Sequence, residues 1–121
     1  MAHALGELNP VQVRELLGAQ HVGRITCQVN GRARMVTVVY HVDEQGHVDV
    51  LTPECEGMGV AQEPLALRFE VDRVEGPSRW STIVGWGFLE PAAETRGQAT
   101  YRIRFTGMRG FYRGARPALA S

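Results

Sequence analysis

The stretch from Gly31 to Thr52 constrains the fold most, because it contains two strand-forming segments joined by a short polar turn. It reads GRARMVTVVYHVDEQGHVDVLT. The first segment, 33–40, is rich in β-branched residues and poor in helix formers, which favours a strand. Residues 43–46 predict a turn in which Gly46 is free to adopt a positive φ. Residues 47–52 then alternate, so the whole stretch predicts an antiparallel hairpin in a β-rich protein.

Composition narrows the class of protein further. The 121 residues suit a single domain covering 1–121, and 44% hydrophobic residues are enough for one core. The formal net charge is zero, which gives no electrostatic reason to expect a nucleic acid or an anionic membrane as partner. Apolar runs are short and no signal-peptide pattern is visible, so we expect a cytoplasmic protein.

Several kinds of chemistry find little support in the residue types. All 13 basic residues are arginine, which excludes Schiff-base chemistry and a Walker-type phosphate lysine. Cys27 lies in a strand pattern and is expected to be a small buried residue, whereas the acidic neighbours of Cys55 disfavour its thiolate. The histidines show no metal-ligand spacing, and no serine lies in a Gly-x-Ser-x-Gly elbow. No metal site and no nucleophilic triad is therefore predicted.

Capping and turn signals divide the remaining chain into one helix and several strands. Asn9 and Pro10 predict an N-cap followed by proline in the first helical turn, and Gly18 is expected to end that helix. Asn30-Gly31 is a strong hairpin signal that joins a strand at 21–29 to the long strand. Further strands are expected at 65–72, 80–89 and 101–106, with a loop at 74–77, a polar connection at 91–99 and flexible tails at 1–8 and 111–121.

Five or six strands joined mostly by short turns predict a mainly β fold with antiparallel pairing. Closure into a small barrel is the natural way for a sheet of this length to remove its edges. The fold class expected from the residues is therefore a small antiparallel β-barrel with a short N-terminal helix.

Three groups of residues carry a family resemblance. They are Leu16-Leu17 with 22–25, Arg34-Met35-Val36 with Thr52, and Phe69-Glu70-Val71-Asp72 followed by 80–87. Their order and spacing over residues 10–90 resemble the flavin-binding split barrels of the pyridoxamine 5′-phosphate oxidase superfamily. The third group is similar to the 5-nitroimidazole-reductase-like branch of that superfamily.

The resemblance implies a split β-barrel that forms a homodimer and binds FMN at the dimer interface, where residues of both chains line it. It also implies an FMN-dependent oxidoreductase that acts on a small molecule. The cofactor-binding residues that it implies are Arg34, Val36, Thr37, Thr52, Trp80, Ser81 and Thr82. Arg34 would contact the phosphate in a bidentate way. No catalytic residue is implied, and Tyr40 and His41 are the nearest titratable candidates for a general acid.

The loop at 53–60 departs from the family pattern. Members usually carry a basic residue there that binds the phosphate, whereas this loop contains Glu54 and Glu56 and no basic residue. A carboxylate at that place repels a phosphate. Either another arginine replaces the missing cation, with Arg24, Arg68 and Arg79 as candidates, or the protein keeps the fold without FMN. In the second case it is a cofactor-free small-molecule-binding or accessory biosynthetic protein. Deazaflavin and haem are further ligands that this fold accommodates.

Overall fold

The structure is a computed structural model that describes residues 5–50, 65–95 and 98–114. One helix and seven strands follow one another in these residues. They are β1 (Leu5–Glu7), α1 (Pro10–Ala19), β2 (Val22–Val29), β3 (Arg32–Val42), β4 (Val48–Val50), β5 (Leu65–Gly76), β6 (Arg79–Thr95) and β7 (Gln98–Arg113).

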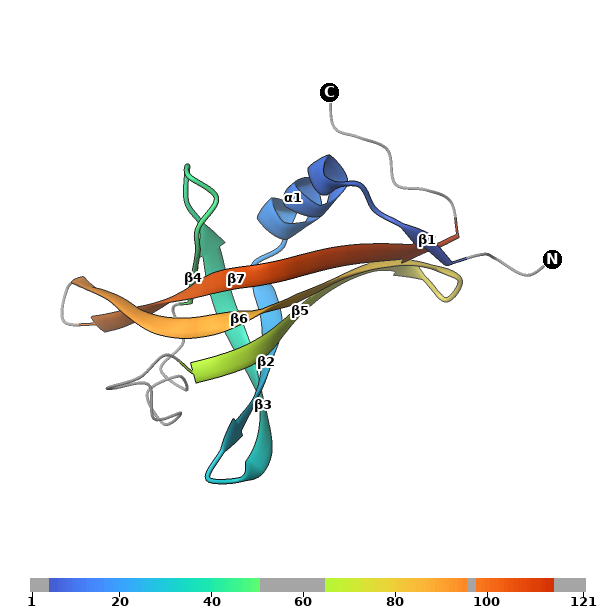
Figure 1. The fold of residues 1–121 in the computed structure, drawn as a ribbon. Coiled ribbons are helices and arrows are strands. Elements are labelled where there is room, and N and C mark those ends of the chain that lie inside the picture. The colour runs from blue at the N-terminus through green and yellow to red at the C-terminus, as the bar shows by residue number, and fades with distance from the viewer. Residues whose placement is uncertain (1–4, 51–64, 96–97, 115–121) are drawn as a thin grey trace.

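The strands form one antiparallel sheet that closes on itself. Their order is β1-β7-β4-β3-β2-β5-β6, and β6 also pairs with β7. Six strands, β2 to β7, therefore form a barrel, and β1 extends its wall beside β7 (Figure 1). The prediction of a mainly β, antiparallel barrel with a short N-terminal helix is confirmed.

The N-terminus of α1 forms as its capping signal predicts. The Gln12 N–H donates to Asn9 Oδ1 at 2.9 Å, and the Asn9 N–H donates to Gln12 Oε1 at 3.0 Å. This reciprocal pair is a capping box, and Pro10 fills the first turn, where its missing N–H leaves no bond unmade. The helix runs one residue beyond Gly18, to Ala19, which is within the usual uncertainty of a helix end.

Both predicted turns of the central hairpins are confirmed. Asn30 and Gly31 have φ values of 54° and 76°, the positive angles of a type I′ turn, so β2 and β3 pair without an offset. Gly46 has a φ of 86° in the turn between β3 and β4, where the Asp43 N–H donates to the His47 carbonyl at 2.9 Å. The predicted returning strand is described as far as Val50.

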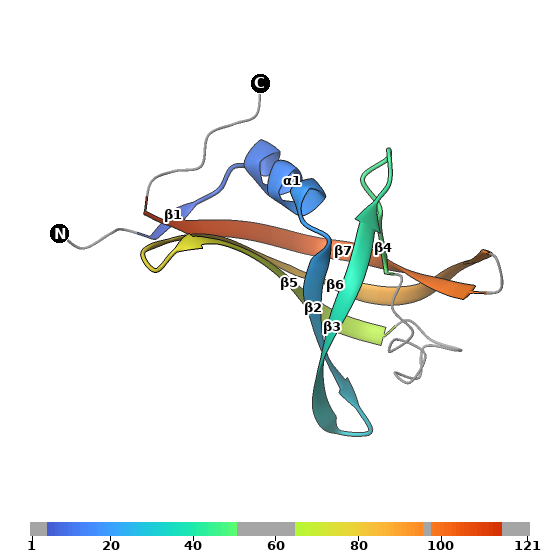
Figure 2. The ribbon, with the colours of Figure 1, turned by 180° about the vertical axis from the view of Figure 1, so that it is seen from behind.

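The core fills the barrel with side chains from every long strand. The largest fully buried side chains are Tyr40, Phe69, Ile25, Ile83, Leu89, Val38, Val48, Val50 and Val71. The rings of Tyr40 and Phe69 meet edge to face with centroids 5.3 Å apart. Leu16 and Leu17 of α1 join this core, and the Tyr40 hydroxyl donates to the Leu17 carbonyl. Figures 1 and 2 show α1 at one side of the barrel, while the β2–β3 hairpin projects from the other.

Gly85 and Gly87 on β6 allow β7 to approach closely. A Cβ on Gly87 would lie 2.2 Å from the Arg104 carbonyl oxygen, and one on Gly85 would lie 2.6 Å from the Phe105 ring. The β6–β7 register also shifts between Trp86 and Gly87, so a β-bulge lies beside these glycines. The space they leave is occupied by β7 rather than by a tryptophan ring.

The predicted loop at 74–77 and the predicted connection at 91–99 are largely wrong. Strand β5 continues to Gly76, and β6 continues to Thr95. The alternation of buried and exposed side chains that predicts a strand stops before Val74, which is 72% exposed. The strand itself continues beyond that point. Proline has no backbone N–H to donate to a neighbouring strand. Pro91 is tolerated in β6 because the β6–β7 register is irregular between Pro91 and Glu94.

The predicted tails at 1–8 and 111–121 also contain structure. Leu5–Glu7 pairs with Phe111–Arg113, and Leu8 is buried with its N–H bonded to the Gly110 carbonyl at 2.8 Å. These segments lie at opposite ends of the sequence, so no local pattern shows that they pair. Residues 1–4 and 115–121 lie outside the described residues. Within the described ranges, no helix has the length and apolar character needed to cross a membrane.

Candidate functional site: a groove at the seam between β2 and β5

The barrel wall opens where β2 and β5 separate. The two strands pair from Arg24 and Glu70 to Cys27 and Leu67. Beyond Cys27, β2 stays paired with β3, and β5 stays paired with β6, but β2 and β5 no longer pair with each other. The separation leaves a groove of about 540 Å³, within the range of small-molecule sites. Its lining residues are Thr26, Cys27, Gln28, Ala33, Leu65, Ala66, Leu67, Arg68 and Trp86.

The floor of this seam groove is apolar. Cys27 and Leu67 are 5% and 6% exposed, and Ala33, Leu65 and Ala66 complete the surface. Burial raises the pKa of the Cys27 thiol, and the nearby Arg34 guanidinium opposes this only in part. Cys27 therefore stays a neutral thiol and serves as a small apolar residue, as the sequence predicts.

One wall of the seam groove carries an exposed aromatic ring beside a cation. Trp86 and Arg68 are direct partners across β6 and β5, and Trp86 is 43% exposed. The Arg68 Nε lies 3.0 Å from Glu70 Oε1, which holds the guanidinium on the outer face. A flat aromatic ligand can stack on an indole and on a guanidinium plane. The groove thus combines an apolar slot with a stacking surface.

The three predicted site residues on β3 do not share one face. Arg34 lies directly opposite Cys27, which lines the seam groove, and is exposed, but it is not itself a lining residue. Val36 has the same orientation and packs half-buried against the core. Thr37 faces the other side of the sheet, exposed and opposite Arg24. Of the three, only Arg34 is the direct cross-strand partner of a residue that lines the groove.

The three predicted site residues on β6 lie away from the seam groove within one chain. Gly87 is opposite Leu67 of the groove, and Thr82 and Trp80 are about 16–23 Å further along β6 at the usual strand rise. Ser81 is 6% exposed, and the Thr82 hydroxyl lies 2.7 Å from Asp72 Oδ1. These side chains do not join Arg34 in the same chain.

Each arginine that could replace the missing phosphate-binding residue already holds a carboxylate. The closest pairs are Arg24 with Asp72 at 2.7 Å, Arg24 with Glu70 at 3.1 Å, Arg68 with Glu70 at 3.0 Å and Arg79 with Glu75 at 2.7 Å. Their charges are therefore largely neutralised. Thr52 and the acidic loop at 53–60 lie outside the described residues.

The titratable candidates on β3 lie away from the seam groove. Tyr40 is 1% exposed, and burial raises the pKa of its phenol to about 12, so it remains protonated and bonded to α1. His41 is exposed opposite Asp49 on β4. Among the residues that the structure describes, no group of His, Cys, Asp and Glu could hold a metal ion. The geometry assigns no general acid.

Sequence reasoning named Arg68 only as a candidate replacement for the phosphate-binding residue, and it did not name Trp86 as a site residue. The signal was present in the alternation of β6, because inward-facing Gly85 and Gly87 require Trp86 to face outward. The alternation does not predict that Trp86 lies beside Arg68. Their pairing depends on the β5–β6 register, which is set by the position of the turn between the two strands.

Comparisons with known proteins identify the fold. No protein-family model matches the sequence, and no curated protein matches it significantly. An FAD-binding protein from Mesorhizobium loti matches with a TM-score of 0.75 and 17% identity, over 93% of this chain and 99% of that chain. A protein from Corynebacterium glutamicum, proposed to be a pyridoxamine 5′-phosphate oxidase, matches with a TM-score of 0.74 and 18% identity, over 93% and 96%. The chain has the split-barrel fold of these flavin-binding and pyridoxamine 5′-phosphate oxidase-like proteins.

An FAD-binding protein from Mycobacterium smegmatis has the same split barrel. Its TM-score is 0.73 at 16% identity, over 90% of this chain and 98% of that chain. These matches confirm the fold that the sequence resemblance implies. At identities this low they establish the split barrel alone, so the ligand of this chain has to be argued from its own residues.

Proposed function

We propose that this split barrel binds FMN in the seam groove and acts as a flavin-dependent oxidoreductase on a small molecule. The observation that carries the proposal is the groove itself, with an apolar floor, the exposed Trp86 ring on its wall and Arg34 as the cross-strand partner of its lining residue Cys27. Two of the structurally similar proteins bind FAD, which supports a flavin as the ligand. The choice of FMN follows the sequence resemblance.

The chemistry of a flavin matches what the groove offers. An isoalloxazine ring needs an apolar slot together with backbone donors and acceptors along its polar edge. Separated strands at a barrel seam expose backbone groups, and Trp86 adds a stacking surface. Arg34 presents the planar fork of donors that suits a phosphate. A bound flavin supplies hydride transfer, and this chain's residues bind and orient it.

We also propose that the active form is a homodimer built on the outer face of β2, β3, β5 and β6. Met35, Val22, Val39 and Trp86 are 68%, 53%, 47% and 43% exposed on that face. Val22 and Val39 are direct cross-strand partners, and Met35 and Trp86 lie in one row across the sheet with Thr26 and Arg68 between them. Exposed apolar surface of this kind commonly marks an interface between proteins. A second copy would also supply the remote segment at 80–82, which one chain cannot bring to Arg34.

A second function is favoured by one specific observation. Because Arg24, Arg68 and Arg79 all hold carboxylates, none of these three candidate replacements offers its full charge to the phosphate of FMN. The alternative is a cofactor-free small-molecule-binding or accessory biosynthetic protein that uses the same groove. The colour of the purified protein separates the two functions. Absorbance in the flavin bands supports the first, and a colourless protein that ignores added FMN supports the second.

Arg34→Ala is the direct test of the proposed phosphate contact. Loss of a charge-assisted hydrogen bond costs about 1.5–3 kcal/mol, which corresponds to roughly a tenfold to hundredfold weaker binding of FMN. Titration by quenching of FMN fluorescence measures this change. Arg73→Ala is the matched control, because Arg73 is an exposed strand arginine at the far end of β5.

Riboflavin, which lacks the phosphate, should bind wild-type protein and Arg34→Ala equally well. If Arg34→Ala and Arg73→Ala bind FMN with the same affinity as wild type, Arg34 is not part of the site.

A further inference from the structure

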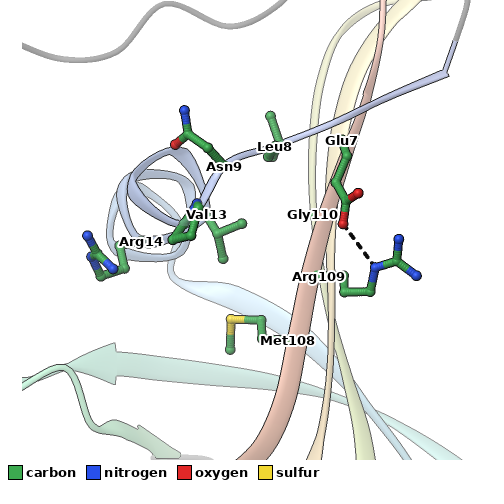
Figure 3. A pocket seen from close by; sticks show the side chains of 9 residues that line it. Glu7, Leu8, Asn9, Val13, Arg14, Met108, Arg109 and Gly110 are labelled. Carbon is green, nitrogen blue, oxygen red and sulfur yellow. Dashed lines mark hydrogen bonds and ion pairs between the residues drawn. The ribbon is translucent and has the colours of Figure 1, made fainter.

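A second cavity lies between α1 and β7 and shares no residue with the seam groove. Its volume is about 570 Å³, again within the range of small-molecule sites. The residues that line it come from β1, the segment leading into α1, the first turns of α1 and β7 (Figure 3). They are Glu7, Leu8, Asn9, Pro10, Val13, Arg14, Met108, Arg109 and Gly110.

The interior of this helix pocket is apolar. Leu8 and Val13 are 6% and 8% exposed, and Met108 is half-buried. Figure 3 shows the Leu8, Val13 and Met108 side chains around the space between the helix and the strand. Methionine is flexible and polarisable, so its thioether adapts to apolar ligands of different shapes. The pocket can therefore take an apolar chain.

A backbone donor and acceptor of β7 face the same space. The Leu8 N–H donates to the Gly110 carbonyl at 2.8 Å, so the backbone groups of Gly110 point away from β6. Because backbone direction alternates along a strand, the N–H and C=O of Met108 point the same way. On that edge β7 pairs with β4 only up to Ile103 and with β1 only from Phe111. Among the described residues, no strand pairs with the Met108 backbone on this side.

The charges at the rim of the helix pocket do not balance. The Arg109 Nε lies 3.0 Å from Glu7 Oε1, and Figure 3 shows this pair on the side of β7 away from Val13. Arg14 stands on the opposite rim, exposed on α1, and makes no ion pair with any carboxylate that the structure describes. Arg14 is one of the residues that line the pocket, so its side chain borders the mouth. Among the described residues, the rim therefore carries one positive charge that no carboxylate pairs with.

We propose that the helix pocket is a second ligand site, and that its ligand is a small amphipathic monocarboxylate. The apolar chain would lie between Leu8, Val13 and Met108, and the carboxylate would sit at the mouth, near Arg14 and the Met108 N–H. The single positive charge of Arg14 matches the single negative charge of a monocarboxylate. This site is independent of the flavin proposal, because it shares no lining residue with the seam groove.

Octanoate, with octanol as its uncharged analogue, is the probe that tests this assignment. Titration into isotope-labelled full-length protein, followed by NMR, should give saturable shifts of the Met108 methyl and Gly110 amide signals and leave the Trp86 indole signal in place. Arg14→Gln should weaken octanoate binding about threefold to tenfold, the scale of an exposed charge-assisted contact, and leave octanol binding unchanged. Arg32→Gln is the matched control, since Arg32 is an exposed arginine in the distant β2–β3 hairpin.

Shifts that do not saturate, or that appear at Trp86 rather than at Met108 and Gly110, would overturn the assignment. Equal effects of Arg14→Gln and Arg32→Gln on octanoate binding would also overturn it. FMN titrations are run on the same samples in parallel. Protein that binds octanoate at the helix pocket but does not bind FMN contradicts only the flavin proposal, and the reverse result contradicts only this one.

Discussion

Asp43 shows how a single carboxylate organises the turn between β3 and β4. Its Oδ1 accepts from the backbone N–H groups of Gln45 and His47 at 2.9 and 2.8 Å, and its Oδ2 lies 3.1 Å from the His47 Nδ1. The backbone hydrogen bond from His47 is the largest cause that lowers the pKa of Asp43, and partial burial opposes it. The folded protein therefore favours the ionised carboxylate.

This lowered pKa gives a pH dependence with a definite sign. The stability that Asp43 contributes is fully present above its ordinary pKa of 3.8 and is lost as the pH falls through its lower folded value. Asp43→Asn keeps an acceptor for the turn but cannot ionise. Its Tm should be below that of wild type at neutral pH, and the difference should shrink between pH 5 and pH 3. Thermal melts followed by circular dichroism measure both proteins, and a constant difference across that range would contradict the assignment.

At the scale of elements, two glycines predict opposite effects of the same substitution. Gly18 lies inside α1, and a Cβ there would meet nothing within 4 Å, so Gly18→Ala should stabilise the protein by about 0.5–1 kcal/mol. A Cβ on Gly87 would lie 2.2 Å from the Arg104 carbonyl oxygen, so Gly87→Ala should force β6 and β7 apart. We expect a loss of several kcal/mol, the scale of a severe core substitution. Urea unfolding compares the two variants with wild type, and similar effects of both would show that the close approach of β7 is wrong.

The sequence could predict those elements whose signals are local. The Asn9 cap, the Asn30-Gly31 turn and the Gly46 turn each lie within a few residues of the structure that they form. The pairing of Leu5–Glu7 with Phe111–Arg113 depends on residues at opposite ends of the chain, so it could not be predicted. The same holds for the site. The resemblance implied Arg34 from a local strand motif, and this assignment stays a prediction, whereas the pairing of Trp86 with Arg68 depends on the register of the β5–β6 hairpin.

For the whole molecule, the exposed apolar face predicts the oligomeric state. Met35 is 68% exposed on the β3 part of that face, so Met35→Glu should place a charge in the proposed dimer interface and leave a monomer. Val11→Glu is the matched control, because Val11 is 44% exposed on α1, outside the four strands of that face. Light scattering behind a sizing column should give a dimer for wild type and Val11→Glu. A monomeric wild-type protein at micromolar concentration would contradict the shared site.

The central claim is that a flavin binds in the seam groove beside Trp86, and the two tryptophans of the chain provide its most direct measurement. Tryptophan fluorescence is recorded during FMN titration of wild type, Trp80→Phe and Trp86→Phe. Because a stacked flavin quenches the ring that it contacts, saturable quenching should persist in Trp80→Phe and be clearly smaller in Trp86→Phe. Quenching that is lost in Trp80→Phe and retained in Trp86→Phe would place the ligand at the far end of β6 and contradict the account.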